Sequence, residues 1–106
     1  MSRKLVRTDI FIVDAASHFA WYATEAETST AERFLTALES TIDRLDESPE
    51  LGRVCGFTHP ALRDLRSIRV DGSFASILIF YRLTTTELIL WRLLHGARDL
   101  PRHLAP

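Results

Sequence analysis

The 106-residue sequence has little cysteine and no long apolar run. Its single cysteine, Cys55, cannot form an internal disulfide, which is typical of a reducing compartment. The apolar stretches 77–81 and 88–94 are far shorter than the roughly 18 residues of a membrane span, and Arg82 and Arg92 interrupt the region. Charged residues close to the N-terminus break the apolar core that a secretory signal requires. We therefore expect a cytoplasmic protein.

The overall composition is that of an ordinary globular domain. Hydrophobic residues make up 46% and charged residues 25%, which excludes a disordered chain. At this length, residues 1–106 are predicted to form a single domain. The sequence has no glycine-rich phosphate loop, and Cys55 and His59 are the only close pair of possible metal ligands, too few for a metal site. We expect neither a cofactor nor a metal.

Charge is divided unevenly along the chain, although the net charge is only −1. Residues 1–50 contain five basic and ten acidic groups, whereas residues 51–106 contain eight basic and four acidic groups. Nearly all of the basic residues are arginine, which docks on carboxylates and phosphates more specifically than lysine, although a GC-rich genome would produce the same bias. A near-neutral chain is a poor non-specific ligand of nucleic acids. The basic half therefore favours an acidic partner surface, and we expect no direct specific binding of nucleic acid.

The first helix is predicted to follow the short run Lys4–Arg7. Thr8 and Asp9 can each cap a helix by accepting a hydrogen bond from a free N–H group, and the helix then extends to about Thr24. Helical spacing gives it a broad apolar side made of Phe11, Ile12, Ala15, Ala16, Phe19, Tyr22 and Ala23. The polar side contains Asp14, Ser17, His18, Trp21 and Glu25.

The second helix is predicted to open with a capping box, in which Ser29 and Glu32 satisfy each other's backbone donors, and to reach about Glu47. Its apolar stripe consists of Ala31, Phe34, Leu35, Leu38, Ile42 and Leu45. Because few residues separate the two helices, we expect them to form an antiparallel hairpin.

Three strands are predicted in the second half, at residues 65–70, 74–83 and 88–95, which are rich in β-branched and aromatic residues. Asp71 and Gly72 predict a tight hairpin turn between the first two strands, and residues 84–87 allow the second reversal.

Alternation along the long strand gives the predicted sheet two apolar faces. One face contains Ile77, Ile79, Tyr81 and Leu83, and the other contains Phe74, Ser76, Leu78, Phe80 and Arg82. The helix hairpin covers one face. The second face requires either a partner or cover from the loop 49–60 and the tail after Gly96.

Four segments in this order resemble the ParE branch of the RelE/ParE toxin superfamily, namely residues 31–35, 48–53, 79–82 and 95–100. The resemblance implies an α+β fold with an N-terminal strand and an antiparallel helix hairpin packed on a mainly antiparallel sheet of three to four strands. It also implies the toxin of a type II toxin–antitoxin system, which a ParD-like antitoxin neutralises by wrapping it. ParE-like toxins are associated with poisoning DNA gyrase, whereas RelE-like toxins cut messenger RNA on the ribosome.

The resemblance also tests whether the chain keeps the RelE chemistry, which uses cations and a proton-transfer group. It places Ser67 and Arg69 at the strand lysines of RelE-like enzymes, Leu78 at the central strand arginine, Arg98 at the cation after the last strand and Leu104 at the tail tyrosine. Because most of these groups are absent, we expect a gyrase poison without catalysis of its own.

Two alternatives stay open. The first is a ribosome-dependent endoribonuclease that uses Arg69, Arg98 and His95, because an imidazole titrates near neutrality. The second is a chain that binds its antitoxin but poisons nothing.

The resemblance and the residue chemistry together predict two contact surfaces. The antitoxin-binding surface is expected to contain Trp21, His18, Arg82 and Arg92, and the target-binding surface Arg66, Arg69 and Arg98. For Trp21 the alternative is contact with the chain's own termini, and for each arginine it is a surface salt bridge.

Overall fold

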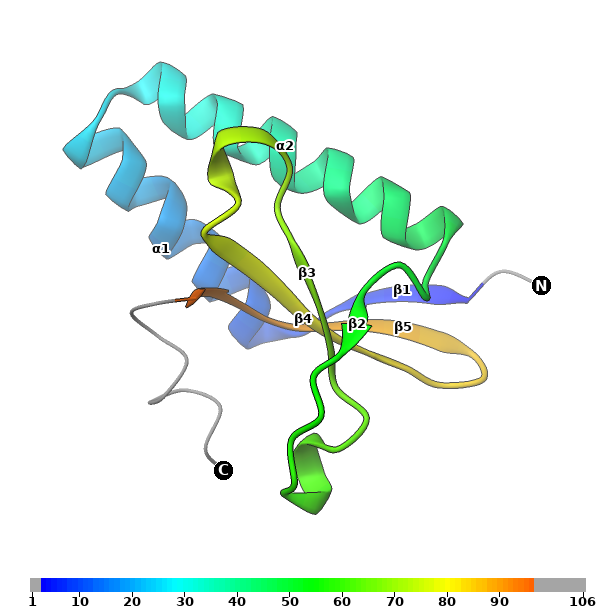
Figure 1. The fold of residues 1–106 in the computed structure, drawn as a ribbon. Coiled ribbons are helices and arrows are strands. Elements are labelled where there is room, and N and C mark those ends of the chain that lie inside the picture. Colours follow the sequence, from blue (N-terminus) through cyan, green and yellow to red (C-terminus); the bar gives the residue numbers. More distant parts are fainter. Residues whose placement is uncertain (1–2, 97–106) are drawn as a thin grey trace.

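In the computed structural model, which describes residues 3–96, two helices pack on one face of a five-stranded sheet (Figure 1). The helices are α1 (Asp9–Glu25) and α2 (Thr28–Glu47), and they lie side by side as an antiparallel hairpin. The strands are β1 (Lys4–Arg7), β2 (Arg53–Val54), β3 (Arg66–Arg69), β4 (Ile77–Leu83) and β5 (Glu87–His95). The predicted α+β fold is confirmed.

The sheet order is β1-β5-β4-β3-β2, with β1 parallel to β5 and the other pairs antiparallel. The short strand β2 brings the number of strands to five, beyond the three to four that were predicted. Two residues are too few for a periodic pattern, so the sequence contains no signal for β2.

Helix α1 begins where the sequence predicts, but part of its predicted apolar side is wrong. The Thr8 hydroxyl caps the helix by accepting a hydrogen bond from the Phe11 N–H group at 3.1 Å. Phe11 and Asp14 are buried, whereas 52% of Ile12 is exposed. The reason is that Asp14 turns inward to meet a buried arginine of β5, so the helix presents a different side to the sheet.

Helix α2 buries its predicted stripe except for Leu35, which is 39% exposed. The capping-box prediction is wrong, because the N-cap residue is Glu27, which makes no side-chain capping bond, and the helix already includes Ser29.

An ion pair joins β1 to α2 at the surface, and it predicts a small acid-sensitive stabilisation. The Arg7 guanidinium donates two 2.9 Å hydrogen bonds to Glu39, and these lower the pKa of that carboxyl below its ordinary value. A lowered folded-state pKa stabilises above the unfolded-state pKa, and the stabilisation is lost as pH falls through the folded-state value. The Glu39 side chain is 52% exposed, so screening limits the effect to below about 1 kcal/mol. We expect Glu39→Gln to lose this amount near neutral pH and progressively less as the pH is lowered through the acid range, as measured by urea unfolding. A loss that does not change with pH would contradict the assignment.

The core between the helices and the sheet contains an aromatic group formed by Tyr22, Phe34 and Phe74. Phe74 was predicted on the face of the sheet opposite Ile77 and Ile79, which is wrong. The predicted tight turn at Asp71 and Gly72 is also wrong. Residues 72–74 instead form a short 3-10 helix that inserts Phe74 beneath the helices, and the strand begins at Ile77. Gly72 lies in this connection with a positive φ of 68°, the conformation that glycine adopts most readily.

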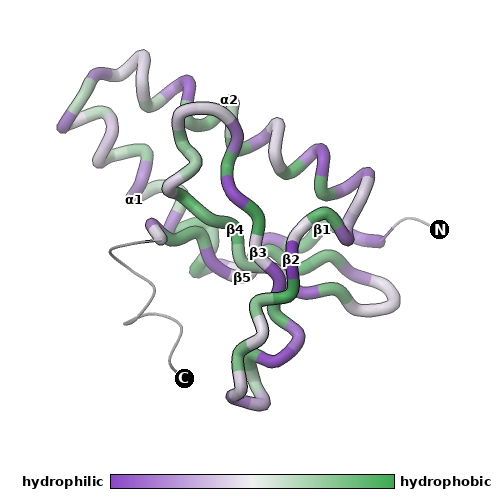
Figure 2. The backbone as a smooth tube through the Cα atoms, in the orientation of Figure 1, coloured by the Kyte–Doolittle hydropathy of each residue, from purple (hydrophilic) through white to green (hydrophobic). Residues whose placement is uncertain are grey.

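The second face of the sheet has its own apolar cluster, in which Leu62, Leu65, Phe80 and Leu94 are buried. Cys55 and Phe57 of the loop after β2 pack against this cluster, so the loop 49–60 provides part of the cover that was considered as the alternative to a partner. Figure 2 shows that hydrophobic residues predominate along β4. The tail that was expected to complete the cover lies outside the described residues.

Candidate functional site

An open depression of about 530 Å³ lies at the β3 edge of the sheet. It forms there because β2 pairs with only Arg66 and Ser67 at the start of β3, as far as the register of the described residues goes. The residues that line it come from α2, the β2 region, β3 with the turn after it, and β4: Arg44, Leu51, Arg53, Ser67, Ile68, Arg69, Val70, Asp71 and Leu78. Segments from four parts of the chain therefore build one surface.

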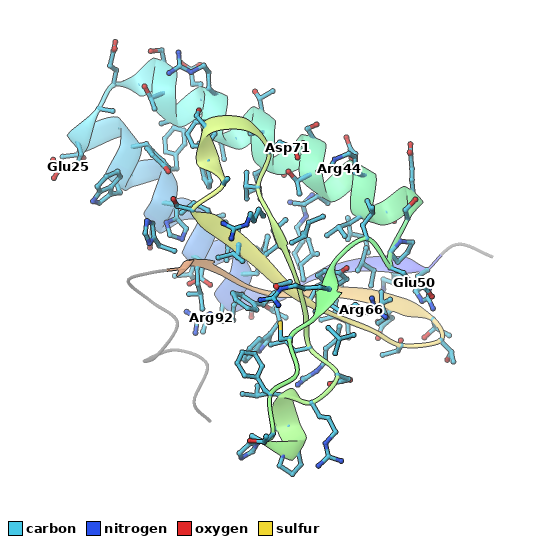
Figure 3. The ribbon with its side chains drawn as sticks, in the orientation of Figure 1. Glu25, Arg44, Glu50, Arg66, Asp71 and Arg92 are labelled. Carbon is cyan, nitrogen blue, oxygen red and sulfur yellow. The ribbon has the colours of Figure 1, made fainter. Side chains whose placement is uncertain are left out.

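The depression is predominantly basic. Three arginines are among the described residues that line it, and the only carboxylate among these residues is Asp71, which forms an ion pair with Arg44 (Figure 3). Arg69 donates a 3.0 Å hydrogen bond to the carbonyl oxygen of Ala75, and Arg53 is exposed. A surface with this charge and with the apolar side chains of Leu51 and Leu78 suits an acidic protein partner.

The predicted target-binding residues are only partly brought together. Arg69 lines the depression. The Nη1 group of Arg66 instead donates hydrogen bonds to the carbonyl oxygens of Gly52 and Glu50, at 2.9 and 3.4 Å. Arg98 lies outside the described residues. The residues missed by sequence reasoning are Arg44, Leu51 and Arg53; only Leu51 and Arg53 had a signal, because both fall in the segment 48–53 that carries the resemblance.

A tyrosine hydroxyl holds one wall of the depression in place. The buried Tyr81 hydroxyl donates to the carbonyl oxygen of Pro49 at 2.9 Å and accepts from the Gly52 N–H group at 2.7 Å. Burial raises the pKa of Tyr81, so the hydroxyl stays protonated near neutral pH and keeps donating. These bonds join segments 48–53 and 79–82, both of which carry the family resemblance, and they position Leu51 and Arg53 beside the sheet edge.

The pairing of β3 with β4 places the side chains that determine the chemistry of the depression. Arg69 pairs with Leu78 across β3 and β4, so two positions that the resemblance aligns with cations of RelE-like enzymes lie close together. Leu78 is a hydrocarbon side chain and Ser67 is 95% buried, with 5% of its surface exposed. No histidine or tyrosine is among the described residues that line the depression, and His95 instead pairs with Ile77 in the sheet. The described lining therefore offers guanidinium groups and apolar side chains as contacts for a partner.

Two of the predicted antitoxin-binding residues, His18 and Arg92, form hydrogen bonds that connect α1 to β5. Arg92 donates hydrogen bonds to both carboxylate oxygens of Asp14, at 2.8 and 2.9 Å, and the Leu93 N–H group donates to the same carboxylate at 2.9 Å. The side chains of Asp14 and Arg92 are each only 11% exposed. His18 Nε2 lies 2.8 Å from the carbonyl oxygen of Leu93. These contacts hold His18 and Arg92 against β5 and α1 within the chain's own fold.

The other two predicted antitoxin-binding residues lie on opposite sides of the sheet. Trp21 is 46% exposed in the helix layer and meets Tyr22 edge-on, with ring centroids 5.3 Å apart. Arg82 lies 5.8 Å from the ring centre of Trp91, which packs on the second face, and it pairs with Asp64 at 3.0 Å. A single partner that contacts both residues must wrap around the sheet.

Within residues 3–96, no cluster of three or more potential ligand side chains that could hold a metal ion occurs. Cys55 is partly buried in the second apolar cluster. The described helices include none that is long and apolar enough to span a membrane.

Comparison with known proteins gives matches in sequence. The family model described as the ParE toxin of the type II toxin–antitoxin system parDE matches residues 6–100. The proteins named Toxin ParE1 from two Mycobacterium tuberculosis strains, CDC 1551/Oshkosh and ATCC 25618/H37Rv, are each 36% identical to this chain over 75 residues. The matched region spans 70% of this chain and 69% of each relative.

Solved structures match in fold. A chain of the chromosomal ParDE toxin–antitoxin system from P. aeruginosa superposes with a TM-score of 0.70 over 87% of this chain and 94% of that chain, at 13% identity. A chain of the E. coli DinJ–YafQ toxin–antitoxin complex superposes with a TM-score of 0.60 over 94% and 99% of the two chains, at 14% identity.

Proposed function

Since this chain belongs to the ParE toxin family of type II toxin–antitoxin systems, we propose that it inhibits growth by poisoning DNA gyrase without catalysis of its own. The observation that carries the proposal is the composition of the depression at the β3 edge. Ser67 and Leu78 occupy positions where RNA-cutting relatives need cations, and the remaining arginines suit docking.

The proposed mechanism is stoichiometric. Arg53 and Arg69 contact an acidic surface of gyrase, while Leu51 supplies apolar contact area at the rim of the depression. The bound toxin holds gyrase in its cleaved-DNA state, so replication is blocked. Such a mechanism requires affinity for one enzyme conformation and no bond-making step by the toxin.

Neutralisation is assigned to a ParD-like antitoxin that wraps the toxin. The placement of Trp21 on the helix layer and of Arg82 on the second face supports this assignment, because one extended partner can reach both around the edge of the sheet. Both neighbours in fold also come from toxin–antitoxin complexes, which fits an antitoxin partner.

The proposal is tested by incubating the purified protein with gyrase, supercoiled plasmid and ATP, and trapping covalent complexes with detergent and protease. We expect linear DNA to accumulate, while messenger RNA on ribosomes stays intact in a parallel reaction. The variants Arg53→Glu and Arg69→Glu are expected to raise the toxin concentration needed for linear DNA by at least about tenfold, because each places a like charge against an acidic surface.

Arg63→Glu is the matched control, since Arg63 is exposed and is not among the residues that line the depression. If Arg63→Glu raises the toxin concentration needed for linear DNA by the same factor, the docking surface is not the depression. Cut RNA with unaffected plasmid would instead establish the ribonuclease and make Arg69, Arg98 and His95 its catalytic candidates.

A further inference from the structure

The edge of β3 that faces away from β4 is paired along only part of its length. Among the described strands, only β2 lies on that side, and its register covers Arg66 and Ser67 (Figure 1). The segment before β2 turns toward Tyr81, whose hydroxyl binds Pro49 and Gly52. Residues 68–70 therefore form a short open edge, and all of them line the depression.

The main-chain groups of Arg69 point into the depression. The Val70 N–H group donates to the carbonyl oxygen of Ile77 on the β4 side, at 2.9 Å. Consecutive residues of an antiparallel strand face alternate neighbours, so the N–H and C=O groups of Arg69 are directed away from β4. The same alternation turns the carbonyl oxygen of Leu65 toward the β2 side, where it accepts a 2.8 Å hydrogen bond from Cys55. Arg69 thus offers one main-chain donor and one acceptor to a partner.

Arginines lie on both sides of this open edge. Arg69 is directly opposite Leu78, which packs on the second face of the sheet, so the Arg69 side chain belongs to the second face. Arg53 is opposite Ser67, two residues before Arg69, and therefore lies on the same face. Arg44 belongs to α2 and lines the depression from the helix side. A strand placed beside Arg69 has guanidinium groups on both of its faces.

We propose that residues 68–70 pair with an extended, acidic segment of gyrase, which continues the row of β2 and adds a strand to the sheet. This inference rests on the proposed function and names the kind of element that the depression binds. Main-chain hydrogen bonds at Arg69 fix the position of the segment, and its carboxylates give the contact its specificity.

The placement of the arginines favours an acidic segment. In an antiparallel added strand, the residue opposite Arg69 places its side chain on the second face, in the same row as Arg53. A carboxylate at this position lies between two guanidinium groups. The next residue of the added strand points to the helix side, where Arg44 has Asp71 as the only carboxylate within the described lining. A basic segment would meet repulsion on both faces.

The proposed pairing is short, which sets the size of its effect. Residues 68–70 extend for roughly 10 Å, so the added strand gains few main-chain hydrogen bonds. Loss of the main-chain donor should therefore weaken gyrase binding without abolishing it, because the arginine side chains still contribute.

The test compares Arg69→Pro with Arg69→Ala. Both variants remove the guanidinium group, but only proline removes the outward N–H group, and it leaves the ladder to β4 intact. We expect Arg69→Pro to raise the dissociation constant for gyrase, measured by surface plasmon resonance, at least about fivefold above that of Arg69→Ala. Thermal unfolding checks that both variants fold.

The matched control is the same pair of substitutions at Arg7, on the opposite edge of the sheet. The N–H groups of Lys4 and Thr8 donate toward β5, at 2.8 and 3.1 Å, so by alternation the N–H group of Arg7 points outward as well. Arg7→Pro and Arg7→Ala should bind gyrase equally.

Hydrogen exchange gives a second measurement that needs no variant. In the free chain the Arg69 amide should exchange faster than the Val70 amide, which donates to Ile77. In the complex with gyrase, exchange of the Arg69 amide should slow at least about tenfold. This measurement decides the matter if Arg69→Pro does not fold.

The outcomes separate this inference from the proposed function. If the wild-type chain does not bind gyrase, the proposed function fails and strand addition fails with it. If gyrase binds but Arg69→Pro equals Arg69→Ala, or the Arg69 amide stays unprotected in the complex, only strand addition is overturned. If Arg69→Pro weakens capture by a ParD-like antitoxin and not binding to gyrase, the open edge belongs to the antitoxin and the inference is wrong.

Discussion

Replacing Asp14 by alanine is expected to lower the free energy of unfolding by about 3–5 kcal/mol. The Asp14 carboxylate accepts hydrogen bonds from the Arg92 guanidinium and from the Leu93 N–H group, and its side chain and that of Arg92 are each 11% exposed. Removing the carboxylate takes two hydrogen bonds from the Arg92 guanidinium and one from the Leu93 N–H group in the protein interior, which is costlier than losing an exposed pair. Urea unfolding followed by circular dichroism measures the change.

Two further variants test whether the loss of stability in Asp14→Ala comes from the buried position of the charge pair rather than from the loss of any ion pair. Glu39→Gln removes the partner of an exposed arginine and should cost below about 1 kcal/mol. The double variant Asp14→Leu with Arg92→Met replaces both charges by apolar groups and should recover much of the stability lost in Asp14→Ala. A loss below about 1 kcal/mol in Asp14→Ala would show that the pair is solvated and contributes little.

Gly52→Ala is expected to destabilise the protein by about 2–4 kcal/mol. A Cβ atom at position 52 would lie 2.3 Å from the Tyr81 hydroxyl oxygen and 2.8 Å from the carbonyl oxygen of Ser67, both far inside contact distance. The tyrosine must move, so its hydrogen bonds to Pro49 and Gly52 break in the interior. Because these bonds position Leu51 and Arg53, the variant should also weaken gyrase poisoning more than its loss of stability alone explains.

The matched control for this glycine is Gly56→Asn. Gly56 has a positive φ of 76°, but a Cβ atom there meets nothing within 4 Å, and asparagine tolerates this backbone conformation. We expect a cost below about 1 kcal/mol for Gly56→Asn and a cost near that of Gly52→Ala for Tyr81→Phe. If Gly52→Ala and Gly56→Asn behave alike in thermal unfolding, the close approach to Tyr81 is not the cause.

The two helices show how well the spacing of apolar residues predicts which side of a helix is buried. In α2 the acidic residues occupy one side, so the buried positions Phe34, Leu38 and Ile42 are predictable from spacing alone. In α1 nearly every position is uncharged, so spacing cannot tell which apolar side faces the sheet. There the position of Asp14 decides the orientation, and an aspartate in a helix gives no sign that its partner lies 78 residues further along.

The sheet likewise contains positions that the sequence predicts and positions that it does not. Alternation in the long strand predicted that Ile79 and Phe80 face opposite sides, and the two apolar clusters confirm it. The position of Phe74 was not predictable, because a 3-10 turn rather than a strand places it against α2.

By itself, the sequence determined the order of the two helices and of the strands other than β2, the two-faced sheet and the family, because periodicity, turn residues and short motifs are local properties of the chain. Only the tertiary structure decided which residues form the site. Arg44, Arg53 and Arg69 belong to separate elements and come together because β2 pairs with only the start of β3. It also decided that Arg92 is an internal anchor while α1 presents an uncharged face to solvent, since burial depends on contacts between residues that are far apart in sequence.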